Sequence, residues 1–266
     1  MTPSGLPLQL PCTKNQQSRD AQCAWDEKPP EELEIRYQKW EQNLPRLLDV
    51  PRALVIAGEQ IEGISLHAFG ETSGRGVAAV VYAVVNQGSC ITQGLAAARS
   101  RLAKQGLTIP RLELVSGHMA LNFIKNVSDA LVGLQVTSMT AWQDGSVALH
   151  WILKGGDFKQ FVGNRIRKIK EHEAVEWRHV PSGENPADLA SRGGLVTKEN
   201  TLWWKGPIWL SDPLQWPPRI LTKVSQEAAA EMKPMKQVFA LAKEENDEMD
   251  TLLLGSSLWR VLRIGA

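Results

Sequence analysis

The sequence has few cysteines and no long apolar stretch. Its three cysteines, Cys12, Cys23 and Cys90, cannot all pair, and they form neither a C-x-x-C motif nor a Cys/His cluster. This argues against a disulfide framework and a structural zinc site, and it fits a reducing compartment. The longest apolar run, residues 77–85, is far shorter than the roughly 20 residues of a membrane helix. We therefore expect an intracellular protein, cytoplasmic or nuclear, with no membrane partner.

An excess of positive charge is missing too. The 30 basic and 29 acidic side chains leave a formal net charge of +1, so binding to a polyanion has to come from local patches. The stretch between Thr72 and Leu112 contains no acidic residue and supplies one candidate patch: Arg75, Arg99, Arg101, Lys104 and Arg111. A second candidate patch consists of Arg165, Arg167, Lys168 and Lys170. Such side chains bind phosphates in a salt-sensitive manner. For the second patch a solvated helix face is an equal alternative, because two glutamates follow it directly.

Composition divides the chain into four parts. With 266 residues, 43% of them hydrophobic, there is room for one domain and additional segments. Residues 1–60 are expected to hold one amphipathic helix, which begins after Pro30 and ends near Pro51. Residues 61–196 carry the pattern of a domain, residues 197–222 are rich in Trp and Pro, and residues 223–266 begin as an acidic linker.

The pattern of residues 61–196 predicts a mixed α/β fold. Strands are expected at residues 64–69, 77–85, 89–92, 136–142 and 175–180, with Gly74 and Gly76 in the first turn. Helices are expected from Pro110 to about residue 125, at residues 146–153 and 161–169, and after Asn185. A leading meander followed by alternating helices and strands indicates a five-stranded mixed sheet with helices on both faces.

The tryptophans that follow this domain allow two interpretations. Trp203, Trp204, Trp209 and Trp216 lie among prolines, so little regular structure is expected there. Half-buried tryptophans are well suited to closing over an apolar surface. The first three could instead stack on nucleic-acid bases, although no basic run interleaves them.

Four acidic residues lie at predicted element boundaries, and each alone has an ordinary explanation. Glu71 fits a solvated turn residue after the first strand. Glu113 fits the first turn of a helix, where the helix dipole favours an acid. Asp144 fits a cap of the next helix, and Asp188 fits the third helical position behind an Asn185 cap.

Taken together, the four acids suggest a metal site. Strand-end and helix-start acids converge at one edge of a mixed sheet, where several carboxylates repel one another unless cations lie between them. Mg²⁺ is the natural cation, with Mn²⁺ as an alternative. Two such ions about 3.5 to 4 Å apart activate a water and stabilise the leaving oxygen in phosphodiester cleavage.

Several segments resemble the RNase H-like region of BEL/Pao-type retrotransposon polyproteins. The most specific are TIPRLEL at residues 108–114 and ENPADLASRG at residues 184–193, supported by LHAFGETS at 66–73, AWQDGSVALHWI at 141–152, FVGNRIRKIKE at 161–171 and LWWKGPIWL at 202–210. The resemblance spans roughly residues 25–216. It implies an RNase H-like fold and a nuclease, a hydrolase that cleaves the RNA strand of RNA/DNA hybrids.

The resemblance also places the chain within a longer polyprotein. In that family the RNase H region follows a reverse transcriptase and precedes an integrase. Residues 1–60 would then be a remnant of the polymerase connection region, and residues 223–266 would lead toward the integrase. The sequence contains no Y-x-D-D motif and no zinc-binding Cys/His array. We expect a free-standing fragment.

The resemblance implies that Glu113, Asp144 and Asp188 match three of the four metal-binding acids of an RNase H site. At the fourth position family members resemble F-C-D-A-S, whereas this chain has Glu71 in place of the aspartate. One added methylene moves a carboxylate by about 1.5 Å, and a misplacement of about 1 Å lowers rates on the order of 100-fold. We expect weakened or absent cleavage.

Three interpretations of the site stay open. The chain is a weakened two-metal ribonuclease, or a catalytically dead nucleic-acid-binding or interaction module, or an inert relic. His179 corresponds to a histidine near the departing product in RNase H-type enzymes. A proton-transfer role and an exposed strand-end position are equally consistent with it.

Overall fold

The sheet consists of a three-stranded meander extended by two parallel strands. The computed structural model describes residues 28, 30–43, 53–193, 196–219 and 225–233. In it β1 (Ile61–Thr72), β2 (Gly76–Gln87) and β3 (Cys90–Leu102) pair antiparallel. β4 (Val136–Gln143) pairs parallel with β1, and β5 (Val175–His179) pairs parallel with β4. The order β3-β2-β1-β4-β5 confirms the predicted five-stranded mixed sheet.

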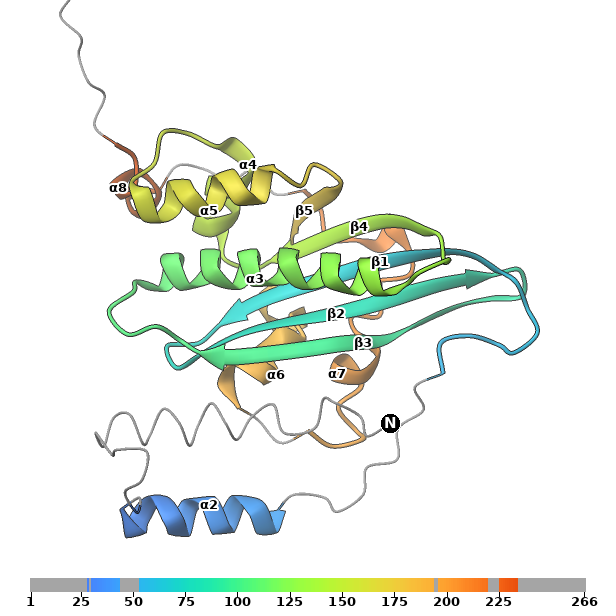
Figure 1. The fold of residues 1–266 in the computed structure, drawn as a ribbon, viewed down its shortest axis with the longest axis horizontal. Helices are drawn as coiled ribbons and strands as arrows, with labels where there is room; N and C mark the ends of the chain where they lie inside the picture. The colour runs from blue at the N-terminus through green and yellow to red at the C-terminus, as the bar shows by residue number, and fades with distance from the viewer. Residues whose placement is uncertain (1–27, 29, 44–52, 194–195, 220–224, 234–266) are drawn as a thin grey trace, which may run out of the picture. The chain divides into compact units, whose positions relative to one another are not determined.

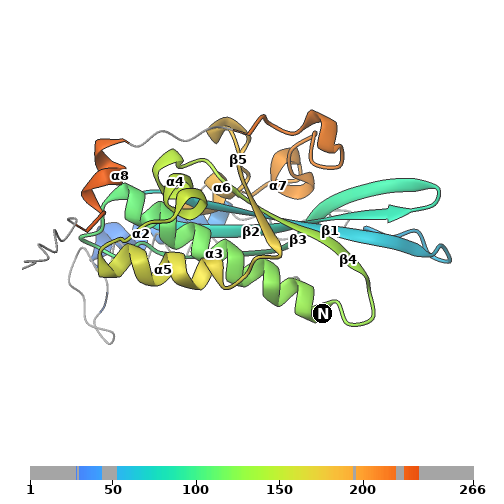
Figure 2. The same cartoon turned by 90° about the horizontal axis from the view of Figure 1, so that it is seen from above.

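Helices cover both faces of this sheet (Figures 1 and 2). α3 (Ile109–Ala130) crosses one face, and α4 (Ser146–Lys154) and α5 (Gln160–Lys170) pack against α3. α6 (Ala187–Arg192) and α7 (Thr201–Lys205) lie on the opposite face. In the described ranges no helix combines the length and apolar character that crossing a bilayer requires.

The remaining elements are short. α2 (Glu31–Asn43) begins where Pro30 predicts, and its predicted end near Pro51 lies outside the described residues. Two 3-10 turns occupy Ser182–Glu184 and Pro213–Gln215. α8 (Gln226–Ala230) is the last helix of the unit Met1–Lys233, and the second unit, Pro234–Ala266, is not described.

β2 is buried on both faces because apolar clusters cover each of them. Val77, Ala79 and Val81 belong to the cluster beneath α3, whereas Val80 and Tyr82 belong to the cluster beneath α6 and α7. This explains why residues 77–85 form an uninterrupted apolar run rather than an alternating one.

β3 is much longer than predicted. The pattern indicated residues 89–92, but the strand continues to Leu102 and pairs with β2 along its length. Residues 96–101 are alanine, arginine and serine, which carry little β-propensity. Long-range pairing with β2 therefore decides their conformation.

The tryptophan-rich segment contains regular structure, contrary to expectation. Trp203 and Trp204 lie in α7, whose Trp204 indole N–H donates to the carbonyl of Thr197 at 2.7 Å. Trp203 and Trp209 are only 3% and 7% exposed and cover the sheet around Trp142. Packing, not base stacking, therefore accounts for these two.

Residues 225–233 pack against the α3 side of the domain. Ala228 is buried, and its carbonyl accepts from the Trp151 indole at 3.1 Å. Glu231 binds Arg111 through two hydrogen bonds of 2.8 and 3.1 Å. This part of the predicted acidic linker is thus joined to the domain by specific contacts.

Candidate functional site

The ends of β1 and β4 bring Glu71 and Asp144 together. The two strands are parallel neighbours with Gly70 opposite Gln143, so the residues that follow lie at the same edge. Asp144 is close enough to interact with Glu71 by a side-chain hydrogen bond and by charge. The structure thus brings together two of the four acids that the sequence places at element boundaries.

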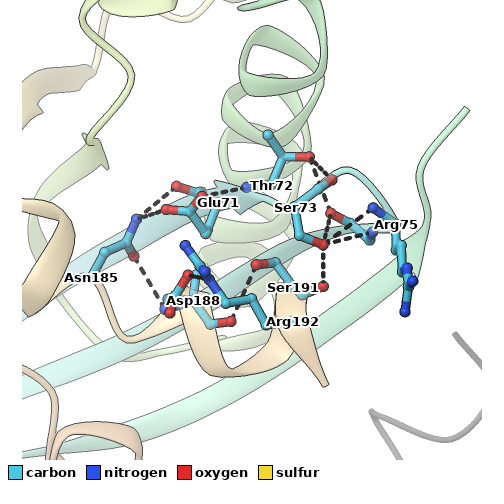
Figure 3. Close-up of polar contacts among 11 residues, drawn as sticks. Glu71, Thr72, Ser73, Arg75, Asn185, Asp188, Ser191 and Arg192 are labelled. Atoms are coloured by element: carbon cyan, nitrogen blue, oxygen red, sulfur yellow. Dashed lines mark hydrogen bonds and ion pairs between the residues drawn. The ribbon is translucent and has the colours of Figure 1, made fainter. Parts of the chain in front are cut away.

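Glu71 is buried, which corrects the alternative of a solvated turn residue. It is 6% exposed and lies within β1. One carboxylate oxygen accepts from the Thr72 backbone N–H at 2.8 Å, and the other accepts from the Asn185 side-chain amide at 2.9 Å (Figure 3). Burial, followed by the hydrogen bond and charge of Asp144, raises the pKa of Glu71 to about 9.

Asp144 is the acid that the other site residues share. Its charge acts on Glu71, Glu113, His179 and Arg192. Its Oδ1 is buried and has no hydrogen-bond partner among the described residues. The predicted helix cap is wrong, because α4 begins behind Gly145 with no side-chain cap. A buried, unpaired carboxylate oxygen is costly unless a cation or donor meets it.

Glu113 lies one residue further into its helix than predicted. α3 begins at Ile109, so Glu113 is beyond the first turn and away from the helix dipole's strongest effect. Burial, followed by the charges of Asp144 and Glu227, raises its pKa to about 7. Desolvation and like charge therefore outweigh the dipole at this position.

Gly145 is needed for the position of the Glu113 carboxylate, which the sequence analysis missed. A Cβ at position 145 would come within 2.3 Å of Glu113 Oε2. Because the Glu113 side chain is flexible, the carboxylate would move rather than the helix. A glycine directly after a strand-end aspartate is the signal that could have revealed this.

Gly145→Ala is therefore expected to weaken metal binding more than folding. A displacement of about 1 Å at a reacting centre costs on the order of 100-fold in rate. We expect the Mn²⁺-induced rise in Tm to shrink, with the metal-free Tm nearly unchanged. Gly74→Ala is the matched control, since nothing lies within 4 Å of a Cβ there. An equal loss of metal-induced stabilisation in both variants would contradict the role of Gly145.

Asp188 and Asn185 come from α6 and the turn before it. The helix begins at Ala187, so Asp188 is its second residue and not the third behind an Asn185 cap. Asn185 Oδ1 accepts from the Ala187 N–H at 3.1 Å, while its amide reaches Glu71. Asp188 pairs with Arg192, which lies one turn later in α6 (Figure 3). The positions of Asn185 and Arg192 beside the acids were not predicted.

His179 ends β5 next to Asp144. It is half-buried, and burial lowers its pKa, partly offset by the charge of Asp144 and a hydrogen bond with the Asp144 backbone. Its imidazole is therefore held mainly neutral near pH 7. The structure brings it to the site, while the proton-transfer role stays a prediction.

The four acids have the right ligand atoms for a hard cation, but their side chains are only partly in position to bind one. All four supply oxygen ligands, and the unpaired Asp144 Oδ1 is a suitable donor. Among the described residues, however, no three His, Cys, Asp or Glu side chains are arranged to hold one metal ion. Glu71 is engaged by Asn185 and Asp188 by Arg192. Glu71, Glu113, Asp144 and Asp188 could hold magnesium only after these side chains reorient.

The two predicted basic patches meet along α3. Arg101 pairs with Val77 on the α3 face of the sheet, and Arg165 and Lys168 lie in α5. Burial, followed by the charges of these three side chains, lowers the pKa of His118 in α3. All three side chains therefore lie close enough to His118 to interact with it by charge. Arg99 pairs with Ala79 on the same face as Arg101.

The other predicted basic residues differ in availability. Arg75 is exposed in the β1–β2 turn and points away from the acids (Figure 3). Arg111 is occupied by Glu231, and Arg167 donates to Asn164 at 2.9 Å. Arg165 lies 3.7 Å from the centre of the Phe161 ring. Lys104, Lys168 and Lys170 are exposed.

The sheet order and the acids at one edge define the class of an RNase H-like domain. Residues 7–145, which are 139 of the 266 residues, match the family described as Pao retrotransposon-like RNaseH-like domain. The chain belongs to this family, as the motif resemblance predicts.

Solved structures with RNase H folds are also similar to the chain. RNase H1 from Halobacterium salinarum has 15% identity and a TM-score of 0.32, covering 47% of this chain and 90% of that chain. LC11-RNase H1 in complex with an RNA/DNA hybrid has 16% identity and a TM-score of 0.33, and the match covers 50% of this chain and 96% of that chain. An N-terminal RNase H domain from Mycobacterium tuberculosis has 15% identity and a TM-score of 0.33, and the match covers 50% of this chain and 99% of that chain. No curated protein sequence matches the chain.

Raising the pH from 7 to about 9 without divalent cations is expected to destabilise the fold. Glu71 and Glu113 have folded-state pKa values of about 9 and 7, above their ordinary 4.5. Their contribution to stability is complete below pH 4.5 and is lost as pH rises through the folded values. Burial lowers the pKa of His67 to about 4, so this residue makes stability rise with pH, but only below about pH 6.5. Glu113 has lost most of its contribution by pH 7, so the window from 7 to 9 reports mainly on Glu71.

The expected loss is at least about 2 kcal/mol, or several degrees in Tm. Thermal unfolding in EDTA measures it, and Glu71→Gln should flatten the dependence. A Tm that stays constant from pH 7 to 9 in the parent chain would show that Glu71 is not held protonated.

Proposed function

We propose that the chain is a metal-dependent ribonuclease that cleaves the RNA strand of RNA/DNA hybrids at a rate lowered by Glu71. The observation that carries the proposal is the gathering of Glu71 and Glu113 around Asp144, whose Oδ1 is buried and unpaired in the described part of the chain, with Asp188 acting by charge on Glu71. Membership in an RNase H-like family supports the same chemistry.

Each residue has a distinct role in the proposed reaction. Glu71, Glu113, Asp144 and Asp188 would hold Mg²⁺, which supplies an activated water and a stabilised leaving oxygen. His179 takes part in proton transfer near the departing product, where the leaving oxygen gains a proton. Arg192 balances negative charge beside Asp188 and Glu71.

The basic residues around His118 provide the surface for the hybrid. Arg101, Arg165 and Lys168 act together on His118 in α3, and Arg99 lies on the same face of β3 as Arg101. These side chains neutralise backbone phosphates. Discrimination against DNA duplexes follows from the A-form shape and the 2′-hydroxyls of the RNA strand.

A non-catalytic nucleic-acid-binding module is the second candidate function. It is favoured by the state of Glu71, whose two oxygens are taken by the Thr72 and Asn185 donors. The lack of a preformed three-ligand metal arrangement in the described residues points the same way. In this case the basic surface persists without hydrolysis.

Incubating the full chain with an end-labelled RNA/DNA hybrid, first in Mg²⁺ and then in Mn²⁺, separates the two functions. The proposal expects slow RNA-strand cleavage that Mn²⁺ enhances, because Mn²⁺ tolerates poorer ligand geometry. Fluorescence anisotropy of the same hybrid in Ca²⁺ reports binding alone. Binding without cleavage in either metal would establish the binding module, and absence of both would leave a relic.

A further inference from the structure

A cavity lies on the side of the domain away from the acids. It is about 440 Å³ in volume and is bounded by β3, α7 and residues 53–54. Its lining includes Leu54, Thr92, Gln93, Trp204, Lys198 and Lys205. Cavities of 300 to 1,000 Å³ with mixed apolar and polar walls are typical of small-ligand sites, and a single nucleotide falls in this range.

The cavity offers an aromatic wall next to positive charge. Trp203 is turned into the core, whereas the neighbouring Trp204 is half-buried and lines the cavity, fixed by its hydrogen bond to Thr197. Lys198 and Lys205 are exposed, and neither takes part in an ion pair with another described residue. Lys198 also interacts by charge with the neighbouring Glu199. An aromatic face flanked by exposed cations matches a base and its phosphate.

Gln93 is a fixed part of the cavity wall. Its Nε2 donates to the carbonyls of Lys205 and Pro207 at 3.0 and 2.9 Å, which ties β3 to the end of α7. Its Oε1 is buried and has no partner among the described residues, so this oxygen is not open to a ligand in the cavity. Gln93 therefore shapes the wall, and recognition falls to Trp204 and the two lysines.

The cavity is too far from the acids to hold the scissile nucleotide. Gln93 pairs with Val84, which pairs with Ser65 of β1, six residues before Glu71. At about 3.3 Å per residue this is roughly 20 Å along the sheet. A ligand here must be a separate part of the nucleic acid.

We propose that this cavity binds an unpaired nucleotide of a single strand that extends beyond the hybrid. The base lies against Trp204, and the phosphates meet Lys198 and Lys205. This binding is separate from the proposed cleavage. It rests on the proposed function only in assuming that the single strand extends from an RNA/DNA hybrid. A short single strand alone is therefore a sufficient probe.

The test measures binding of fluorescein-labelled pentathymidylate to the full chain by anisotropy over a range of salt. Lys198→Ala/Lys205→Ala is expected to weaken binding at least tenfold. It should also lower the slope of log affinity against log salt by about 1.4, or about 0.7 per phosphate contact. Lys198→Arg/Lys205→Arg keeps the charge and should bind within about twofold of the parent.

Base stacking is tested separately at Trp204. Trp204→Leu is expected to lose about 5- to 100-fold in affinity and Trp204→Phe much less, since stacking on an aromatic ring accounts for the difference. Thermal unfolding of each variant confirms that it is folded. Equal affinity of the parent and the double alanine variant would overturn the proposal, as would equal affinity of the leucine and phenylalanine variants.

A blunt RNA/DNA hybrid, measured in parallel, keeps this inference apart from the proposed function. Loss of hybrid cleavage with retained pentathymidylate binding would reject the nuclease and keep the cavity. Hybrid cleavage with no effect of the cavity variants on pentathymidylate binding would reject the cavity and keep the nuclease.

Discussion

Replacing Asp144 by asparagine is expected to abolish cleavage of RNA/DNA hybrids while making the metal-free protein more stable. Asp144 is the acid whose charge reaches Glu71, Glu113 and His179. Asparagine keeps the shape but removes the charge that would attract a cation. We expect a fall of at least about 1,000-fold in the cleavage rate, equivalent to about 4 kcal/mol.

The gain in stability follows from the same contacts. At pH 8 the charge of Asp144 repels the ionised Glu113 and keeps Glu71 protonated, and Oδ1 of Asp144 is buried without a partner in the described part of the chain. An asparagine amide can donate to Glu71 and removes the repulsion. We expect about 1 to 2 kcal/mol of added stability at pH 8 in EDTA, or roughly 2 to 8 °C in Tm.

The opposite directions of these two effects make the result informative. A variant that lost activity by unfolding would show a lower Tm. Asp129→Asn is the matched control, because Asp129 is exposed at the end of α3 and should change neither quantity. Cleavage that survives in Asp144→Asn at the parent rate would show that the nuclease activity does not come from this site.

The sequence was sufficient to predict the five strands of the sheet, but not the full length of β3 or the helix α7. The run at residues 77–85 and the helix start at Pro110 carry strong local signals, and both elements form as predicted. The second half of β3 and the helix α7 carry weak or contrary local signals. The second half of β3 forms because it pairs with β2. The helix α7 forms on the face of β2 that carries Tyr82, whose hydroxyl donates to the Trp203 carbonyl at 2.6 Å. Such contacts have no local signature.

The acids of the site were predictable as a set, but their surroundings were not. The spacing of Glu71, Asp144 and Asp188 at element ends follows from strand and helix patterns. The contact of Asn185 with Glu71 joins residues 114 positions apart, and that of Glu231 with Arg111 joins residues 120 apart. These distant partners decide which acids are paired and which basic residues are free. The motif ENPADLASRG did contain Asn185 and Arg192, but local capping rules assign Asn185 only to the helix start.

Restoring aspartate at position 71 is expected to raise Mg²⁺-dependent cleavage by about 10- to 100-fold. The shorter side chain withdraws the carboxylate by about 1.5 Å, which takes it away from the Asn185 amide and frees its oxygens. Mg²⁺ requires near-ideal octahedral geometry, so it should gain more than Mn²⁺ from the corrected position. The ratio of Mn²⁺ to Mg²⁺ rates should therefore fall in Glu71→Asp.

Glu71→Gln separates this geometric effect from a simple relief of charge. Glutamine keeps the length of glutamate and removes the charge, so it should raise the Tm above pH 7 without raising cleavage. If Glu71→Asp and Glu71→Gln are equally inactive, the added methylene is not what limits the site, and the binding module becomes the better account. If only Glu71→Asp gains activity, the other three acids are already placed well enough for catalysis. Glu71 then acts by displacing one ligand in a site that is otherwise assembled.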